Sequence, residues 1–404
     1  MTFDPIVFIK TWFEGLASSW GWDPAFVNFV ATLTAVLATA SVVLGIFIFL
    51  TWLERKVAAR IQDRIGPNRV GPFGLFQPLA DAIKMVTKED TTPDGADKVA
   101  YNIAPILTVI SVLLMWAVIP FSATWIGTDL NVGVLYVAAV GSFGVVAVLM
   151  AGWSSNNKYA LLGAFRAVAQ LISYEVPLFL AMFIPVFFAR SMSLNDIVEA
   201  QAGYQWFVFI SPLGFAIFLI ASLAEIGRTP FDLLEAESEL VAGYHIEYSG
   251  MKFGMFQAGE FMHSFTASAL FSLLFFGGWQ AEFANTPMIA VLVFFVKTFF
   301  FFFILMWSRS TLPRLRIDHM MALGWKVLVP VMLVLLMGTP LLDYYVKDMG
   351  WTRVGAHALF NLVILLVTLE VVRRSNRPEN KERVRFEGRP VAVPPKEEEA
   401  AAQG

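Results

Sequence analysis

Long apolar segments recur along this chain, separated by shorter polar stretches. A helix needs about 20 mostly apolar residues to cross the hydrocarbon core of a bilayer, and nine segments approach or exceed that length. They cover residues 26–53, 101–121, 131–153, 172–190, 206–224, 262–279, 287–307, 327–343 and 355–372. The pattern predicts an all-α, polytopic transmembrane protein with about nine spans.

The composition agrees with a membrane protein. Hydrophobic residues make up 57% of the chain, and Phe alone occurs 38 times, which is far too apolar for a soluble globular domain. Residues 1–25 carry Lys10 and Glu14 inside an apolar stretch and lack a basic start. They are therefore expected to form an interfacial segment rather than a cleaved signal peptide.

Lys and Arg are distributed unevenly between the two faces that this topology creates. Cytoplasmic loops are enriched in basic residues, and most of them lie after the odd-numbered spans and in the charged tail 373–404. The opposite face has only Lys10, Arg190, Lys347 and Arg353. The N-terminus is therefore predicted outside and the C-terminus in the cytoplasm, and the polar, Pro-containing tail is expected to be largely disordered or to lie on a partner.

The chain has no Cys and only four His. Disulfides, thiolate-bound zinc and Cys-ligated iron–sulfur clusters are therefore excluded from this chain. A haem held by two His would need them opposite each other at membrane depth, whereas the four His are expected in loops or near helix ends. No redox cofactor is expected on this chain.

The predicted cytoplasmic loop 54–100 begins with the sequence "ERKVAARIQDRIGPNRVGPFGLFQPLADAIKMVTKED". Two Gly-Pro pairs, 66–67 and 71–72, favour tight turns. The glycines match neither a dinucleotide fingerprint nor a P-loop. The basic residues could simply anchor anionic lipid headgroups, but that leaves the rigid turns and the segment "QPLADAIK" unexplained.

The predicted loop 225–261 is rich in carboxylates. They are Glu225, Asp232, Glu235, Glu237, Glu239, Glu247 and Glu260. Thr229 followed by Pro230 is typical of a helix start, and a helix there would put Asp232, Glu235 and Glu239 on one face, with Glu237 pointing away. The segment could be a solvated acidic helix, but crowded carboxylates beside a membrane raise one another's pKa and can exchange protons.

Ionisable residues also occur within or at the ends of the spans. Lys297 lies near the middle of the seventh span, where a charge is costly, so it is expected to face the interior and to pair with a carboxylate. Glu175, Glu225 and Glu260 are expected near the cytoplasmic edge. Either structural pairing or a place on an ion route explains Lys297; the second is the usual meaning of such a charge.

Five motifs can be set beside known families. They read "ERK", "RIGPNRVGPFGLFQPLADAIK", "RAVAQLISYEVP", "AEIGRTPFDLLEAESELVAGYHIEYSG" and "WSRSTLPRLRIDHMMALGWK". Together they resemble the complex I subunit 1 family, most closely its bacterial members, over about residues 26–345. The ninth span and the tail after residue 373 depart from the shorter family members.

The resemblance implies a function. In that family the subunit joins the membrane arm of a proton-pumping NADH:quinone oxidoreductase to the hydrophilic arm, forms much of the quinone chamber and carries no redox cofactor. It implies quinone as substrate, FMN and iron–sulfur clusters on partner subunits, and location in the bacterial plasma membrane. The expected partners are hydrophilic-arm subunits, antiporter-like membrane subunits and lipid, with no nucleic acid.

The resemblance also implies roles for individual residues. Residues near the quinone chamber and its entrance are Glu54, Arg55 and Arg64, and the acidic loop that lines the chamber contributes Arg228, Asp232, Glu235, Glu237 and Glu239. The polar route toward the antiporter-like subunits contains Glu175, Glu225, Glu260 and Lys297. Asp232 and Glu235 are expected to act with this route in the reaction, and Glu247 matches a family position too.

Three alternatives stay open at this point. The equivalent membrane subunit of a membrane-bound hydrogenase, or of a dehydrogenase with another donor, would have nearly the same sequence features. A stand-alone ion-coupled transporter would favour broken helices in two repeated halves, and no such repeat is visible. A purely structural anchor predicts that neutralising the loop carboxylates changes assembly and not turnover.

Overall fold

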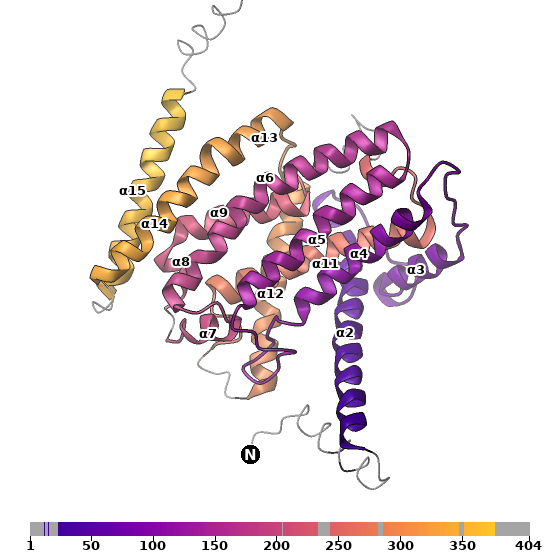
Figure 1. The fold of residues 1–404 in the computed structure, drawn as a ribbon, viewed down its shortest axis with the longest axis horizontal. Helices are drawn as coiled ribbons and strands as arrows, with labels where there is room; N and C mark the ends of the chain where they lie inside the picture. The colour runs from indigo at the N-terminus through magenta and orange to yellow at the C-terminus, as the bar shows by residue number, and fades with distance from the viewer. Residues whose placement is uncertain are drawn as a thin grey trace, which may run out of the picture.

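The computed structural model describes residues 12, 15, 23–203, 205–232, 243–281, 286–346 and 351–375. Figure 1 shows the arrangement. The helices are α2 (Pro24–Ile61), η1 (Pro72–Gly74), α3 (Gln77–Thr87), α4 (Lys98–Trp116), α5 (Gly133–Ser154), α6 (Lys158–Ala189), α7 (Leu194–Glu199), α8 (Phe207–Ile210), α9 (Pro212–Ile226), η2 (Gly243–His245), α11 (Gly250–Phe275), α12 (Pro287–Thr311), α13 (Ile317–Leu323), η3 (Gly324–Leu328), α14 (Val329–Val346) and α15 (Trp351–Ser375).

The described residues contain helices and no strands, which confirms the predicted all-α class for that part of the chain. Seven of these helices are long and apolar enough to cross a membrane. The other two predicted spans coincide with α9, an apolar helix of 15 residues, and with α11. The total of nine spans and the orientation of the termini stay predictions.

Several helices are longer than the apolar runs that predicted them. The segment 154–171, expected as a loop, is helical from Lys158 onward. Its charges interrupt the apolar run, but small residues at helical spacing, among them Gly163 and Ala167, form a buried face. Glu175 is consequently in the middle of α6. Likewise α2 continues to Ile61 and α11 begins at Gly250, so Glu54 and Glu260 belong to helices rather than loops.

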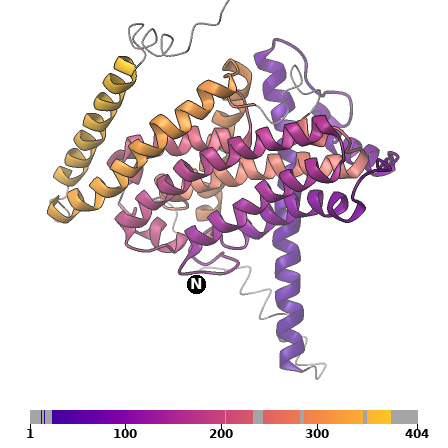
Figure 2. The same cartoon turned by 45° about the horizontal axis from the view of Figure 1, so that its top comes forward.

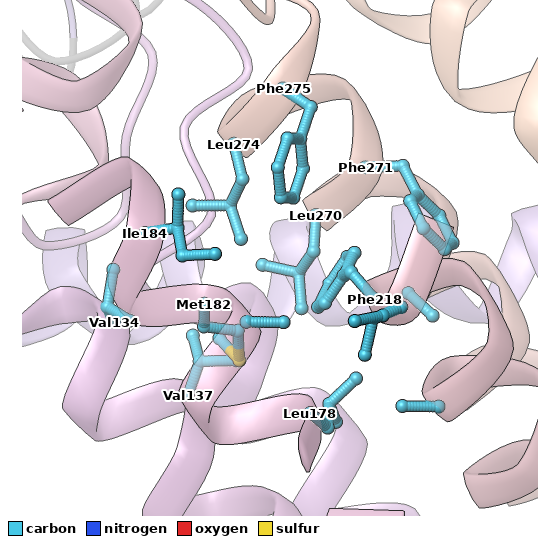
Figure 3. Close-up of a cluster of buried hydrophobic side chains, with 14 of the residues drawn as sticks. Val134, Val137, Leu178, Met182, Ile184, Phe218, Leu270, Phe271, Leu274 and Phe275 are labelled. Atoms are coloured by element: carbon cyan, nitrogen blue, oxygen red, sulfur yellow. The ribbon is translucent and has the colours of Figure 1, made fainter. Parts of the chain in front are cut away.

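The largest core cluster lies where α5, α6, α9 and α11 meet. Figure 3 shows their side chains converging, with Val137, Met182, Phe218, Leu270 and Phe275 among them. All five are buried. Nearer the other end of α5 and α6, a separate core cluster includes Ala151 and Ala164, and the helices approach closely: a Cβ atom added at residue 152 would lie 2.2 Å from the Cβ of Ala164.

Two helices stand at the edges of this bundle. The first half of α2 extends away from the other helices in both views (Figures 1 and 2), and most of its apolar side chains there are exposed. At the opposite edge, α15 packs against α14 and exposes a row of Leu and Val side chains. Such exposed apolar faces are expected of helices that contact lipid or neighbouring membrane helices.

Candidate functional site

A buried carboxylate joins three separate elements at one end of the bundle. Glu54 of α2 accepts a hydrogen bond from Nη1 of Arg228 at 2.8 Å and a second, shorter one from Nη1 of Arg309 in α12. The Arg228 guanidinium also lies 4.7 Å from the ring centroid of Phe261. Through these two hydrogen bonds Glu54 holds both guanidinium groups beside the chain segment 227–232.

The segment 227–232, called the turn here, is held in one conformation by its neighbours. Gly227 ends α9 with a φ of 70°, which glycine adopts without strain. The Thr229 hydroxyl donates to the carbonyl oxygen of Arg309 at 2.6 Å, and the backbone N–H of Leu315 donates to the Pro230 carbonyl at 2.9 Å. The turn is therefore fastened to α12 and to the segment that follows it.

This turn forms one wall of a small polar pocket. The pocket is lined by Gly227, Arg228, Thr229, Asp232, Gln257, Glu260 and Arg309. Both guanidinium groups and two carboxylates line the same space. The arrangement can bind a polar ligand group or hold ordered water, and it can exchange protons with either.

A second pocket, the middle pocket, shares Glu260 with the polar pocket. Its lining includes Ser111 of α4, Gly144 of α5, Glu225 of α9, Tyr244 of η2 and His263 of α11. Tyr244 donates a hydrogen bond to Oε1 of Glu260 at 3.2 Å, and Nε2 of His263 lies 3.5 Å from Oε1 of Glu225. The two carboxylates each have a neighbour that can share or donate a proton.

A third pocket, the inner pocket, shares Glu225 and His263 with the middle pocket. Its other walls are apolar side chains, including Met115, Leu178 and Phe218. Glu175 of α6 lies beside this region, interacts electrostatically with Glu225 and His263, and accepts a hydrogen bond from the Ser142 hydroxyl of α5. Glu260 and Glu225 thus line adjoining pockets, and Glu175 lies beside the innermost of them without lining it.

Lys297 contacts main-chain carbonyls among the described residues, where a carboxylate partner was expected. Its ammonium donates to the backbone carbonyl oxygens of Phe276 at 2.8 Å and Gln280 at 3.0 Å, and lies 5.0 Å from the Trp206 ring centroid. No carboxylate pairs with it within the described residues. The unsatisfied carbonyls at the end of α11 attract a cation, and that end is about 24 Å along the helix from Glu260.

The basic loop lies outside the pockets. Arg55 pairs with Asp81 of α3, and Lys84 lies 3.5 Å from the same carboxylate. Burial alone would raise the pKa of Asp81, but the hydrogen bond and positive charge of Arg55 dominate and lower it. Arg64 donates to the side-chain oxygen of Gln62 at 2.7 Å. Arg55 and Arg64 thus make their contacts with Asp81 and Gln62 and do not line the polar pocket.

Glu247 belongs to a separate group of contacts at the start of α11. Its carboxylate accepts a hydrogen bond from the Asn157 amide at 2.6 Å, and its carbonyl accepts one from the Tyr101 hydroxyl. The rings of Tyr101 and Tyr248 stack with centroids 4.1 Å apart. Burial raises the pKa of Tyr248 to about 12, so it stays a neutral hydrogen-bonding group. These contacts fix the segment between η2 and α11.

Most of the residues expected in the site are therefore placed. The structure brings Arg228, Asp232, Glu260 and Glu225 to adjoining pockets, and Glu54 is hydrogen-bonded to Arg228 at the edge of the first. Glu235, Glu237 and Glu239, with most of the predicted acidic helix, lie outside the described residues. The described ranges hold no group of three or more His, Asp or Glu side chains that could bind a metal ion.

Three residues of the site were missed by sequence reasoning. His263 lies one turn after Glu260 on α11, a spacing that the sequence displays. It was expected near a helix end, whereas it is inside α11. Arg309 is the basic residue in the last turn of α12, and its partner Glu54 is 255 positions away in the sequence. Tyr244 likewise meets Glu260 only through the fold.

Comparison with known proteins places these features in a family. A family model described as NADH dehydrogenase matches residues 33–340. The chain is 46% identical over 333 residues to the subunit designated H of NADH-quinone oxidoreductase from Dehalococcoides mccartyi, an alignment covering 82% of this chain and 92% of the relative.

Two further relatives have the same kind of similarity. An NADH-quinone oxidoreductase subunit of the same designation from Syntrophobacter fumaroxidans is 49% identical over 328 residues, covering 79% of this chain and 96% of the relative. The corresponding subunit from Brevibacillus brevis is 46% identical over 334 residues, covering 82% and 97%. The family match ends within α14, so α15 lies beyond it.

Proposed function

Because the chain belongs to the NADH dehydrogenase family, we propose that it is the quinone-chamber and coupling subunit of a proton-translocating NADH:quinone oxidoreductase, respiratory complex I. The relatives are named as subunits of NADH-quinone oxidoreductases. These names favour NADH over hydrogen or another donor, and a subunit of a complex over a stand-alone transporter.

The proposal assigns the chain to a bacterial plasma membrane, in contact with hydrophilic-arm and antiporter-like subunits. The chain itself carries no redox cofactor; FMN and iron–sulfur clusters belong to the partners. Quinone enters from the bilayer and accepts two electrons from a partner's iron–sulfur cluster, together with two protons. This chain contributes the walls of the quinone chamber and the groups that respond to the charge change.

The observation that carries the proposal is the series of three adjoining pockets. Arg228, Asp232 and Glu260 face the polar pocket, where a negative charge on reduced quinone would be felt. Glu260 connects it to the middle pocket, and Glu225 with His263 connects that to the inner pocket. A change in protonation at one end can therefore shift the protonation of the next carboxylate.

The predicted site residues that line none of the three pockets also have a place in this proposal. Glu235 is assigned to the reaction with Asp232, and Glu237 and Glu239 to the chamber wall. Lys297 is assigned to the far end of the polar route, toward the antiporter-like subunits, and Arg55 and Arg64 to the chamber entrance. A buried or half-buried charge on a membrane span is most often part of an ion path.

Replacement of Asp232 by Asn tests the assignment. The variant should retain assembly of the complex while NADH-dependent quinone reduction falls by more than about tenfold, because a group that responds to the quinone charge has been neutralised. The tagged complex would be purified from native membranes, with flavin and iron–sulfur content and NADH oxidation by an artificial acceptor as controls. Normal quinone reduction in the assembled variant would contradict the assignment.

A further inference from the structure

A buried glutamine on α6 holds the turn that carries Arg228. Gln170 is 1% exposed, and its side-chain Nε2 donates to the carbonyl oxygen of Ala224 at 2.6 Å and to that of Phe231 at 2.7 Å. Ala224 belongs to the last turn of α9, before the turn 227–232, and Phe231 belongs to the turn itself. One amide group therefore fixes the chain on both sides of Arg228.

The packing around Phe231 reinforces the clamp, by which we mean the two hydrogen bonds that Gln170 donates on either side of Arg228. The Phe231 side chain is buried, and its ring lies 5.3 Å from that of Tyr174, one helical turn after Gln170 on α6. The Tyr174 hydroxyl in turn donates to the Met320 carbonyl of α13 at 2.9 Å. Buried carbonyls need a donor. Gln170 supplies one to Phe231, and it supplies a shorter one to Ala224 than the 3.3 Å bond that the Ala224 carbonyl accepts from the N–H of Gly227.

The same face of α6 also contacts Gly243, which is the first described residue after Asp232. Gly163 is two turns before Gln170, and a Cβ atom added to it would lie 2.7 Å from the carbonyl carbon of Gly243. Gly243 has a φ of 71°, a conformation that favours glycine. The two anchor points are about 10.5 Å apart along α6.

We propose that Gln170 is a positioning residue for quinone reduction, which sets the location of Arg228 and Asp232 by fixing the turn 227–232 to α6. Gly163 supports it by fixing Gly243 to the same face. This inference rests on the proposed function, because it gives the turn a role in quinone binding. It adds that α6, which also carries Glu175, is the common support of the polar pocket and of the inner part of the route.

A second buried glutamine, Gln201, provides a matched control. Gln201 is fully buried, donates to the carbonyls of Ile197 and Leu273, and accepts hydrogen bonds from the N–H groups of Phe207 and Gly277. It therefore has the same chemistry as Gln170 but fixes the turn after α11, far from the polar pocket. Loss of either amide should destabilise the bundle, whereas only loss of Gln170 should displace the turn 227–232.

The test uses the intact complex with Gln170→Met, Gln170→Asn and Gln201→Met. Methionine has a similar length and no donor, and asparagine keeps an amide that is too short to reach both carbonyls. In Gln170→Met, amide hydrogen exchange in peptides covering residues 227–232 should become about tenfold faster. The KM for a short-chain quinone should rise about fivefold, with kcat changing less than twofold.

The other variants make the result decisive. Gln170→Asn should give smaller changes in the same direction, and it keeps the proposal testable if Gln170→Met does not assemble. Gln201→Met should leave both the exchange at 227–232 and the KM unchanged. Unchanged exchange at 227–232 in the Gln170 variants would overturn the clamp. Faster exchange with unchanged quinone kinetics would overturn the role of the turn in quinone binding, which is part of the proposed function.

Discussion

Two buried carboxylates in this molecule have the same exposure and similar basic partners, but the space beside them differs. Glu54 and Asp343 each have 10% of their side chain exposed, and each binds an arginine, Arg228 at 2.8 Å and Arg353 at 2.7 Å. Each also has a second basic partner, Arg309 for Glu54 and a fully buried histidine for Asp343. Burial and pairing alone therefore do not distinguish them.

The difference lies in the space beside each group. Both arginines of Glu54 line the polar pocket, and the group joins three elements that are distant in the sequence. Among the described residues, the Asp343 ion pairs join α14 to α15, line none of the pockets described above, and pack against the ring of Phe188 in α6. A buried charge cluster with no adjoining pocket is expected to hold helices together, and one that lines a pocket can take part in chemistry.

Replacement of Glu54 by Gln should have the largest effect on activity. It leaves two guanidinium groups without their shared carboxylate, so Arg228 should move within the polar pocket. Quinone reduction should fall by more than about tenfold, with electron transfer to an artificial acceptor retained. Steady-state assays of the purified complex would measure it. A variant with normal KM and kcat would show that the Glu54 cluster is structural, like that of Asp343.

Replacement of Asp343 by Asn should have the opposite profile. It leaves the half-buried Arg353 without its carboxylate and should cost about 3 kcal/mol of local stability. Detergent-solubilised complex should lose this subunit at a lower temperature, while the initial rate of quinone reduction stays within about twofold of wild type. A large loss of turnover before any loss of assembly would remove the distinction between the two clusters.

Replacement of Lys297 by Met distinguishes a structural role of this residue from a role in proton translocation. The ammonium caps the end of α11, and the proposed function also places it on the polar route. Loss of the charge should lower the number of protons translocated per NADH by about twofold, with a smaller loss of turnover. Proteoliposomes with a pH-sensitive dye would measure the ratio. An unchanged ratio with reduced thermal stability would leave Lys297 as a helix cap only.

The Arg55–Asp81 pair on the surface should have the smallest effect. Since Arg55 lowers the pKa of Asp81 below its usual value of 3.8, the pair stabilises the fold above that pH and loses this contribution as the pH falls through the lowered pKa. Replacement of Asp81 by Asn should cost about 0.5 kcal/mol. The difference in melting temperature should be constant between about pH 5 and pH 8; a difference that changed there would contradict this pairing.

The sequence predicted the helices better than their ends. Hydropathy located α2, α4, α5, α6, α9, α11, α12, α14 and α15, because an apolar run of this length has few alternatives. It placed a loop at 154–171, because Lys158 and Arg166 mask the small-residue face that α6 buries. Hydropathy measures polarity, whereas the helix is stabilised there by the close approach of backbones.

The site was predictable as a list of residues and not as an arrangement. Motif resemblance named Glu54, Arg228 and Glu260, but nothing in the sequence pairs Glu54 with Arg309. Lys297 was expected to find a carboxylate, and in the described part of the chain it binds main-chain carbonyls, which every residue carries and no sequence pattern reveals. Contacts between distant segments depend on how helices pack, and this packing is set by many side chains together.

In the proposed function, the adjoining pockets relay the charge change of quinone reduction through their shared carboxylates. Replacement of Glu260 by Gln tests it most directly, because Glu260 connects the polar pocket with the middle pocket. In proteoliposomes containing the whole complex, NADH oxidation and proton uptake would be recorded together. The number of protons translocated per NADH should fall by at least about twofold. Full turnover with an unchanged ratio would contradict it.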